Sequence, residues 1–508
     1  MNKNQLKQGV MLSYLSLFMG NLISIVYTPV MLRLLGKSEF GLYTLANSVI
    51  GYLGLLSFGF SGAYIRYFSR FKAENNKKGI SVLNGLFISV FLLAGALALI
   101  FGCVLASNSS VLFGSKLSGG ELGRIKIIMY MLAVNLAVSL PSGLFSSYVT
   151  AHERYIFQKT VNLIKIVVNP FVTLPVLLLG CGSVGFTAVS VVLSLALELA
   201  NIVFCFKRLK MKFSFRFTRE DFALLKEIAV FSSFIFINII VDQINWNVDK
   251  FLLGIYKGTG DVAVYGLAAQ LNSYYLNLAV TISAVFAPRI NMLAAKGNDG
   301  EINSLFRSVG RLQFAVLSFA LIGFAFLGRA FISFWAGEGY GETYAIFLIL
   351  SIPVTVSLIQ NLGIEILRAK NLHRFRSLAY LVIALLNIGA SIPLCKVAGG
   401  TGCALGTAAA FVIGNGFIMN CYYGRRAGLD ILKFWREIAG FFPALAAAAG
   451  GALLLRLVIS VEKPVGFIVF GVLFSLIFAA CMWLFGLNEY EKALISKPLA
   501  KIFGRLRT

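Results

Sequence analysis

Residues 80–106 read ISVLNGLFISVFLLAGALALIFGCVLA and contain no charged side chain in 27 consecutive positions. About 20 apolar residues in a helix are enough to cross a hydrocarbon core of about 30 Å. A helix also satisfies its own backbone hydrogen bonds, which lipid cannot do for it. This stretch therefore predicts a membrane-spanning helix, and the same pattern decides the fold of the rest of the chain.

Comparable apolar runs recur along the whole sequence of 508 residues. The residues AVILMFWYC make up 58% of the chain and charged residues only 13%, against about 25% in ordinary globular proteins. The composition predicts an all-α polytopic membrane protein with about fourteen transmembrane helices. The expected spans are 9–32, 41–65, 80–106, 124–149, 161–179, 185–206, 228–254, 263–287, 310–334, 343–367, 378–395, 401–423, 438–460 and 465–485.

The charges that do occur indicate how the spans cross the membrane. The chain has 45 Lys and Arg against 21 Asp and Glu, with a formal net charge of +24. If the N-terminus is cytoplasmic, most basic residues fall in cytoplasmic segments, of which the stretch from Lys207 to Lys226 is the largest. The positive-inside rule therefore predicts both termini in the cytoplasm. We expect a multi-pass protein of the cell (cytoplasmic or inner) membrane. Because we attribute the positive charge to topology, we expect no nucleic-acid partner.

An internal repeat predicts how the spans are grouped. Leu34-Leu35-Gly36 after the first span reappears as Leu252-Leu253-Gly254 after the seventh, and Gly182-x-x-Gly185 reappears as Gly399-x-x-Gly402, at offsets of 218 and 217 residues. Transporters built from such parallel repeats bind substrate between the halves. We expect two pseudo-symmetric six-helix lobes and two extra C-terminal helices. The corresponding segments are 1–209 for the N-terminal lobe, 210–226 for a basic cytoplasmic loop, 227–426 for the C-terminal lobe, and 427–508 for helices 13 and 14 with a basic tail.

Few residues suit a metal, a cofactor or catalysis. The seven cysteines are scattered without a CxxC pair, and the two histidines, His152 and His373, fall in basic loops. GCGSVG at 180–185 matches GxGxxG, but it lies between two apolar helices and not after a strand, so no nucleotide site is expected. No segment outside the spans is long enough to form a catalytic domain. We expect no metal, no cofactor, no catalytic residue and no enzymatic activity.

The seventh span carries a stripe of polar side chains. Asn238, Asp242, Asn245 and Asp249 follow one another at steps of four, three and four residues, which places them on one helical face. Ionisable groups inside a membrane are costly and usually face a bundle interior or a water-filled cavity. We interpret the stripe as the lining of a substrate cavity, with hydrogen bonding between packed helices as the alternative.

Other spans contribute fewer candidate binding residues. The first span corresponds to the seventh in the repeat, and it presents the polar residues Asn21 and Ser24. Polar residues on both helices are expected if the two helices line one cavity. Lys165 on the fifth span and Glu365 on the tenth lie near predicted cytoplasmic ends, where snorkelling to the interface is an equal alternative to a functional role. Arg66, at the cytoplasmic end of the second span, either holds a phosphate through its planar fork of donors or serves as a topology charge.

Three loop and helix-end motifs carry a family resemblance. The loop after span 1 reads LGKSEFGLY at 35–43, span 7 closes with Asp249 and Leu253-Gly254, and Val184-Gly185 through Ala188 opens span 6. With these motifs the chain resembles, over essentially its whole length, the Wzx-type polysaccharide and oligosaccharide flippases. These belong to the MATE-like (MOP flippase) superfamily, with the multidrug exporters and the lipid II flippase MurJ. The resemblance implies alternating-access transport of an undecaprenyl-diphosphate-linked repeat unit, with basic residues gripping the diphosphate. The carboxylates of span 7 depart from that pattern.

The expected function is therefore the flipping of lipid-linked oligosaccharide repeat units from the cytoplasmic to the outer leaflet. Expected partners are the lipid-linked glycan and membrane lipids, with a glycan polymerase or glycosyltransferases and H⁺ or Na⁺ coupling as further options. The alternative is an ion-coupled small-molecule exporter of the MATE type, in which Asp242 and Asp249 would bind the ion. Span 1 lacks the acidic residue of many such exporters. A membrane glycosyltransferase or polymerase is disfavoured by the absence of a large loop.

Overall fold

The computed structural model describes residues 3–370, 372–489, 491–493 and 496, and their side chains apart from those of 3–11, 13, 14, 220, 234 and 373. Every regular element in this described part is a helix. The chain forms two compact units, each assembled from two stretches of sequence. The first unit contains the described residues up to Gly266 together with Ile388–Cys403, and the second contains Leu267–Asn387 together with those from Ala404 onward.

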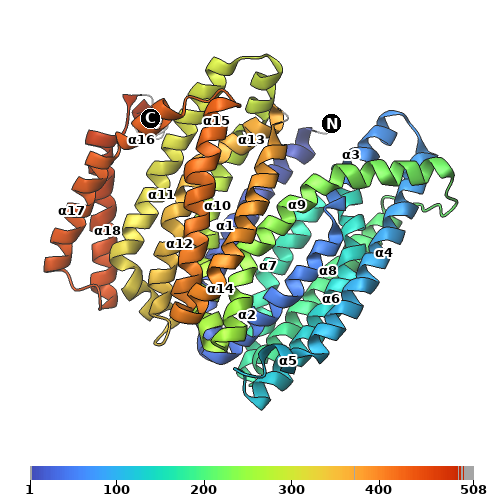
Figure 1. The fold of residues 1–508 in the computed structure, drawn as a ribbon, viewed down its shortest axis with the longest axis horizontal. Coiled ribbons are helices and arrows are strands. Elements are labelled where there is room, and N and C mark those ends of the chain that lie inside the picture. The colour runs from blue at the N-terminus through green and yellow to red at the C-terminus, as the bar shows by residue number, and fades with distance from the viewer. Residues whose placement is uncertain (1–2, 371, 490, 494–495, 497–508) are drawn as a thin grey trace, which may run out of the picture. The chain divides into compact units, whose positions relative to one another are not determined.

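The first unit consists of the helices coloured blue to green in Figure 1, joined by the first turns of α10 and by the middle of α14. Its elements are α1 (Lys3–Leu35), α2 (Lys37–Gly51), the 3₁₀ helix η1 (Tyr52–Ser57), α3 (Phe60–Ala73), α4 (Lys77–Ser107), α5 (Ser109–Phe113), α6 (Gly119–Ala151), α7 (Tyr155–Leu178), α8 (Gly182–Lys207), α9 (Arg219–Tyr256) and the start of α10 (Thr259–Ala295).

The second unit contains the rest of α10 and the helices that follow it. These are α11 (Asp299–Ala336), α12 (Glu342–Ile359), α13 (Asn361–Ala369), α14 (His373–Phe411), the π-helical η2 (Val412–Met419), α15 (Asn420–Arg425), α16 (Ile431–Ala439), α17 (Phe442–Val458), α18 (Pro464–Cys481) and the π-helical η3 (Met482–Gly486).

The spans agree with the prediction from the sequence. Thirteen segments of the described residues are helical, long and apolar enough to cross a membrane. The longest, Arg374–Arg425, contains two arms, because the backbone at Gly399 (φ 55°, ψ −131°) is not helical and the chain reverses there. Asn387 donates to Thr407 Oγ1 at 3.2 Å, 20 residues away, which requires the arms to run antiparallel. The twelve other segments and these two arms give fourteen spans in the described chain, which confirms the predicted all-α polytopic fold.

The second span is interrupted, which its uniformly apolar sequence does not predict. After α2 and η1, Phe58 (φ 47°) and Gly59 (φ 68°) adopt left-handed backbone before α3 begins. A Cβ atom on Gly59 would lie 2.6 Å from Cγ2 of Ile235 on α9, so both the backbone conformation and the available space require glycine. The crossing expected as one helix over 41–65 is therefore made by two helices with different axes.

An aromatic cluster forms the core at one end of the first unit. The rings of Tyr64 on α3 and Phe87 on α4 meet edge to face with centroids 5.1 Å apart, and both side chains are almost fully buried. The Tyr64 hydroxyl donates to Asn84 Oδ1 at 2.5 Å, and Asn84 Nδ2 donates to the Lys212 carbonyl at 2.8 Å. The buried polar atoms of this core are thus paired, as stability in a low-dielectric interior requires.

The returning stretch of α14 completes the first unit. Lys396 places its ammonium 5.0 Å from the centre of the Tyr256 ring at the end of α9. A Cβ atom on Gly399 would lie 3.2 Å from Oδ1 of Asp261, so the reversal itself packs against the start of α10. Residues near position 400 are therefore structural parts of the N-terminal unit.

A buried arginine braces the second unit. Arg311 on α11 is 8% exposed and donates Nε to Glu491 at 2.6 Å and Nη2 to the same carboxylate at 2.9 Å. It also donates to the carbonyls of Glu437 at 2.8 Å and Gly486 at 3.1 Å. Its guanidinium lies 4.4 Å from the centre of the Phe441 ring. These contacts join α11 to α16 and to the segment that follows η3.

The last two spans of the second unit pack through small residues. Ala444, Ala448 and Ala452 recur every four residues on α17 and are fully buried. Small side chains allow helix backbones to approach closely, which is the usual basis of helix packing in a membrane. Phe470 and Phe474 of α18 complete this apolar cluster.

Candidate functional site

The first unit contains a polar cavity of about 530 Å³. Five helices, α1, α2, α6, α7 and α8, contribute to its wall. The lining residues are Gly20, Asn21, Ile23, Ser24 and Tyr27 of α1, Tyr43 and Asn47 of α2, Leu132 and Asn135 of α6, Asn162, Lys165, Ile166, Asn169 and Pro170 of α7, and Ser190, Val191 and Ser194 of α8.

The polar character of the cavity arises from helical spacing on α7 and α8. Asn162, Lys165 and Asn169 recur at steps of three and four residues, so α7 turns all three toward the cavity. Ser190 and Ser194 are four residues apart on α8. Lys165 Nζ donates to Ser194 Oγ at 3.0 Å, which fixes the ammonium at the junction of the two helices.

Several polar groups of the cavity retain free hydrogen-bonding capacity. An ammonium has three donors, and the described side chains satisfy one donor of Lys165, through Ser194. Oδ1 of Asn135 is buried and accepts no hydrogen bond from the described residues. Glu198, one turn beyond Ser194, attracts Lys165 electrostatically, yet its Oε2 has no hydrogen-bond partner in the same described set.

The cavity wall can bind a neutral or anionic polar ligand. Amides and hydroxyls offer both donors and acceptors, and the ammonium of Lys165 offers a point positive charge. No Asp or Glu occurs among the described residues that line the cavity. This donor set suits hydroxyl-rich or phosphate-bearing molecules better than cations.

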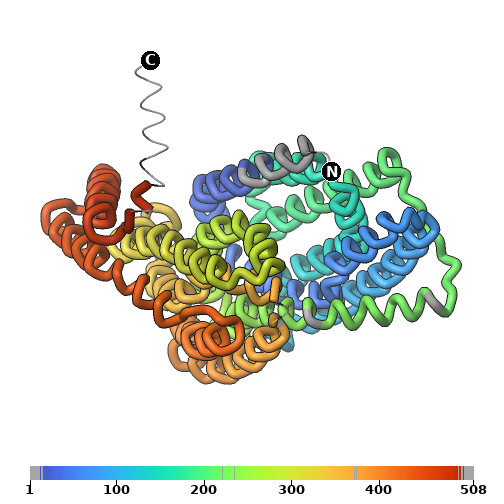
Figure 2. Tube along the Cα trace, turned by 90° about the horizontal axis from the view of Figure 1, so that it is seen from above, coloured from blue at the N-terminus to red at the C-terminus, as the bar shows by residue number. Residues whose placement is uncertain are grey.

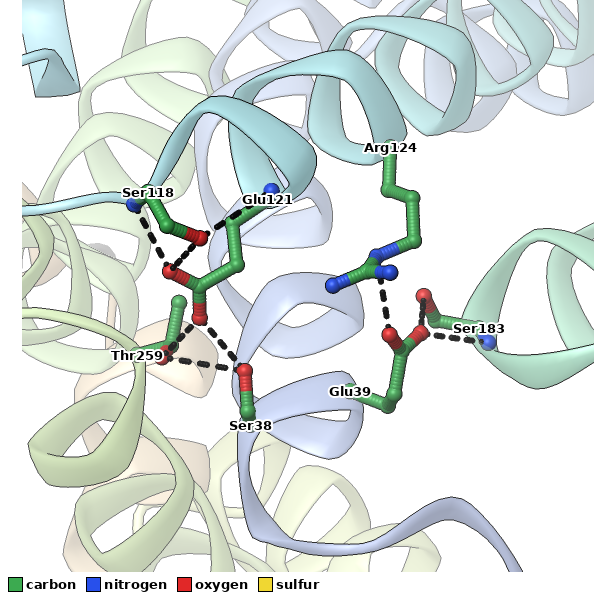
Figure 3. Close-up of polar contacts among 7 residues, drawn as sticks. All are labelled: Ser38, Glu39, Ser118, Glu121, Arg124, Ser183 and Thr259. Atoms are coloured by element: carbon green, nitrogen blue, oxygen red, sulfur yellow. Dashed lines mark hydrogen bonds and ion pairs between the residues drawn. The ribbon is translucent and has the colours of Figure 1, made fainter.

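A second polar cluster joins four helix N-termini of the first unit, as Figure 3 shows. Ser118 caps α6, with its backbone N–H donating to Glu121 Oε2 at 2.9 Å. The other oxygen of Glu121 accepts from Ser38 of α2 at 2.5 Å and from Thr259 of α10 at 2.9 Å. One carboxylate therefore holds the N-terminal turns of three helices together.

The neighbouring carboxylate in Figure 3 binds the fourth helix. Glu39 of α2 accepts the backbone N–H of Ser183 at 2.9 Å, and also its hydroxyl, at the start of α8. Arg124 of α6 pairs with the other Glu39 oxygen at 2.9 Å. A carboxylate is favoured beside the positive end of a helix dipole, so both acids stabilise the arrangement of the helices that they contact.

Comparison with known protein families assigns the chain to one of them. The model of a family described as "Polysaccharide biosynthesis protein" matches residues 6–294, more than half of the sequence. The chain belongs to this family. The match covers the helices that line the cavity and both carboxylates of the helix N-termini.

Two relatives of the chain support this family assignment. The uncharacterized membrane protein EpsK of Bacillus subtilis is 22% identical over 496 residues, which cover 95% of each chain. A putative O-antigen transporter of Shigella flexneri is 22% identical over 335 residues, which cover 63% of this chain and 74% of that protein.

Solved structures share the fold of this family member. The lipid II flippase MurJ in an inward closed conformation superposes with a TM-score of 0.73 at 16% identity, over 93% of this chain and 99% of MurJ. An inward-facing multidrug resistance transporter of the MATE family superposes with a TM-score of 0.63 at 13% identity, over 82% of this chain and 95% of that one. The fold is thus one that flippases and multidrug exporters have in common.

Three of the nine predicted site residues meet at the cavity of the first unit. Asn21 and Ser24 line it from α1, and Lys165 lines it from α7. The structure therefore brings together candidates that the sequence placed on two different spans.

The stripe on α9 is not part of the cavity wall. Asp249 is buried, with 2% of its surface exposed, and one of its oxygens accepts a hydrogen bond from the Tyr265 hydroxyl of α10. Asp242 is exposed, whereas Asn238 and Asn245 are half-buried. The role of this stripe in substrate binding stays a prediction.

The two remaining candidates have other contacts. The Arg66 side chain is exposed on α3, with its guanidinium 4.4 Å from the centre of the Phe231 ring. Glu365 on α13 pairs with Arg368 at 2.8 Å, one helical turn away. Neither residue lines the cavity.

Sequence reasoning did not select several polar residues of the cavity wall. Asn47, Asn135, Ser190 and Ser194 each lie within an apolar span, and none belongs to a long polar stripe. The only available signal was the presence of an amide in the middle of a span, where a polar group needs a partner or a ligand.

Proposed function

We propose that this protein moves lipid-linked oligosaccharide repeat units, of the undecaprenyl-diphosphate type, from the cytoplasmic to the outer leaflet by alternating access. Membership of the polysaccharide biosynthesis family supports a role in glycan assembly. The Shigella relative named as an O-antigen transporter supports transport of such a glycan. We include in the proposal a cytoplasmic-membrane location with both termini inside and no enzymatic activity.

The cavity of the first unit is the observation that carries the proposal. A repeat unit combines sugar hydroxyls with a negatively charged diphosphate. The amides of Asn21, Asn135 and Asn162 match the hydroxyls, and the ammonium of Lys165 matches the diphosphate. A volume of about 530 Å³ lies within the range of about 300–1,000 Å³ that is common for small-molecule sites. The cavity therefore suits part of a repeat unit, while the lipid chain remains in the membrane.

The chain's own residues would act by binding and orientation. Lys165 is held by Ser194, so its charge is positioned before cargo arrives. The buried Oδ1 of Asn135 would gain a donor from a sugar hydroxyl, which removes the cost of an unpaired polar atom. Both effects favour the cargo without a covalent step. Coupling to H⁺ or Na⁺ and cooperation with a polymerase or with glycosyltransferases are further parts of the proposal.

A reconstitution assay tests this function. Purified protein in liposomes that contain a fluorescent lipid-diphosphate-linked oligosaccharide is expected to make the inner-leaflet cargo accessible to an external quencher. Empty liposomes and liposomes with the Lys165→Gln variant serve as controls. Equal quenching with and without the wild-type protein would overturn the proposal.

An ion-coupled exporter of small cations is the second candidate. It is supported by the fold shared with a MATE transporter and by the buried carboxylate of Asp249. The cavity wall argues against it, since no described lining residue is acidic. Cationic dye efflux driven by an imposed proton or sodium gradient, without movement of lipid-linked glycan, would favour this candidate.

A further inference from the structure

In the segment between α8 and α9, apolar residues alternate with polar ones, most of them basic. None of these residues lines the cavity on which the proposed function rests. Residues 208–219 read RLKMKFSFRFTR, with apolar side chains at every odd position from Leu209 to Phe217 and cations at 208, 210, 212 and 216. Figures 1 and 2 show the part between α8 and α9 as a green stretch of chain without helical turns, within the first unit. From Met211 to Thr218 the chain is neither helix nor turn, and alternate side chains of such an extended backbone point to opposite sides. The segment therefore separates an apolar side from a basic side.

The apolar side and the backbone fix this segment on the first unit. Met211 is buried, and Phe213 and Phe217 are half-buried. The backbone N–H of Ser214 donates to the Ser81 carbonyl at 2.9 Å, on the first turns of α4. A Cβ atom on Gly85 would lie 2.0 Å from the Ser214 carbonyl oxygen, so α4 has glycine where the segment crosses it. The basic side is thus held in place and does not hang on a mobile loop.

Six exposed cations lie within this segment or directly beside it. Lys207, Arg208, Lys210, Lys212, Arg216 and Arg219 are all exposed. None of the six forms an ion pair with a carboxylate among the described side chains.

Among the described side chains, the acids Asp221 and Glu74 have other partners. Asp221 accepts from the backbone and the hydroxyl of Thr218 at 2.7 Å in each case, which caps α9. Glu74 pairs with Arg70 at 3.2 Å. The N-terminus of α4, on which the segment lies, adds two further exposed cations, Lys77 and Lys78.

Two exposed aromatic rings accompany the cations. Phe215 is 63% exposed and Phe222 is 59% exposed, with Phe217 between them at centroid distances of 6.5 and 6.3 Å. Aromatic side chains next to basic residues at a span end are the usual composition of a membrane-interface contact. The segment directly follows the last residue of the span α8 and ends on the first residue of α9, so we expect it at the level of the lipid headgroups.

We propose that the segment Arg208–Arg219 binds anionic phospholipid headgroups of the leaflet at this end of α8 and α9, with Phe215 and Phe222 inserted among the lipids. Clusters of four to eight basic residues beside a transmembrane helix attract anionic lipids in this way. Because Lys212 and Arg216 are four residues apart, about 13 Å along an extended chain, the cations contact several headgroups and not a single one. The charge pattern of the sequence assigns this end of the spans to the cytoplasmic leaflet.

Native mass spectrometry of the purified full-length protein, titrated with phosphatidylglycerol or phosphatidylcholine, tests this site. The test variant is Lys210→Gln/Lys212→Gln/Arg216→Gln. The matched control, Lys116→Gln/Lys257→Gln/Lys463→Gln, removes three exposed cations from the opposite predicted side of the membrane. Each surface cation contributes about fivefold to binding, so the test variant is expected to bind phosphatidylglycerol on the order of a hundredfold more weakly. The control variant is expected to bind it like wild type.

Amide hydrogen exchange in lipid nanodiscs locates the contact. Phosphatidylglycerol is expected to slow exchange over 208–219 in wild type but not in the test variant, and high salt is expected to cancel the effect. Unchanged melting temperatures would show that both variants fold. Equal phosphatidylglycerol binding by wild type and test variant, or equal losses in test and control variants, would overturn the proposal. So would protection of this segment only by a lipid-linked diphosphate cargo or by an added soluble protein. Because no readout involves transport, the result is independent of the proposed function.

Discussion

Lys165 in the first unit and Arg311 in the second are both cations inside an apolar helical unit, but their surroundings differ. Four of the five N–H donors of Arg311 have partners, two of them on the carboxylate of Glu491. Lys165 has one hydroxyl partner and adjoins a cavity, and the nearby Glu198 does not neutralise it through a direct hydrogen bond. A cation whose N–H donors mostly have partners within the protein stabilises the fold. A cation with unpaired donors beside a cavity is available to a ligand.

The difference follows from the cost of burying charge. Removing a charge from water costs several kcal/mol unless a partner and further hydrogen bonds offset it. Arg311 meets that condition entirely within the protein. Lys165 meets it only in part, and this residual cost favours the arrival of an anion. The same reasoning predicts how variants at the two positions separate stability from transport.

The largest expected effect on stability is at Arg311. Arg311→Met leaves Glu491 as a buried charge without its partner, which is expected to lower the free energy of unfolding by about 3–5 kcal/mol. Chemical denaturation in detergent and protein abundance in the membrane measure it. The control is Lys492→Met, which removes an ion pair to Glu489, a residue whose side chain is 93% exposed, and is expected to cost less than about 1 kcal/mol. An equal loss of unfolding free energy in both variants would show that Arg311 stabilises the protein no more than a surface ion pair does.

Lys165→Gln is expected to affect transport more than stability. A charge-assisted hydrogen bond contributes about 1.5–3 kcal/mol, so cargo flipping is expected to fall by roughly tenfold to a hundredfold. The melting temperature is expected to change little, because glutamine retains a donor for Ser194. The liposome quenching assay measures the first quantity and thermal unfolding the second.

Lys165→Arg sharpens the same experiment. It retains the positive charge and is expected to restore part of the transport that the glutamine variant loses. Wild-type flipping by Lys165→Gln would show that this cation, despite its unsatisfied donors, is not a binding residue.

The carboxylates of α9 provide a smaller test within the first unit. Asp249 is buried and bonded to Tyr265, so Asp249→Asn is expected to lower the free energy of unfolding by about 1–3 kcal/mol. Asp242 is exposed, and Asp242→Asn is expected to leave stability unchanged and to reduce flipping if the stripe faces cargo. Unfolding and flipping are measured on both variants. Normal abundance and normal flipping in both variants would show that the stripe neither binds cargo nor stabilises the fold.

The smallest expected effect concerns the cluster of helix N-termini. Glu39→Gln removes the charge that faces Arg124 and the start of α8, which is expected to cost about 1 kcal/mol. Glu342→Gln, an exposed acid in the first turn of α12, is the control and tests the dipole contribution alone. A thermal unfolding difference between the two variants isolates the contribution of the cluster, and identical melting temperatures would contradict it.

The spans were largely predictable because hydropathy is a property of local sequence. The stretch 80–106 became the core of α4, and the reversal between the eleventh and twelfth spans occurs at Gly399, within the interval left between them. The break at Phe58 and Gly59 was not predictable, because YLGLLSFGFSG is equally apolar on both sides of it. Whether an apolar run is one helix or two depends on neighbours such as Ile235, which lies far away in sequence.

The site was predictable only where polar residues recur along one helix. Asn21, Ser24 and Lys165 belong to local polar patterns, and the structure places all three at the cavity. Asn47 and Asn135 lie singly on two other helices, and only tertiary packing brings them to the same wall. The contacts of Glu121 with Ser38 and Thr259 likewise join positions more than 80 residues apart, which no local pattern records.

The composition of the first unit has a consequence for synthesis at the ribosome. Its last stretch, Ile388–Cys403, emerges 122 residues after Gly266. At the usual elongation rate of about 5–20 residues per second, the nascent unit waits roughly 6 to 25 s for its final piece. During this interval Tyr256 and Asp261 lack the partners that Lys396 and Gly399 later supply. A chain truncated before residue 388 would lack these contacts permanently. We therefore expect the N-terminal half on its own to be less stable than the same residues in the whole protein, and to be degraded by membrane quality control.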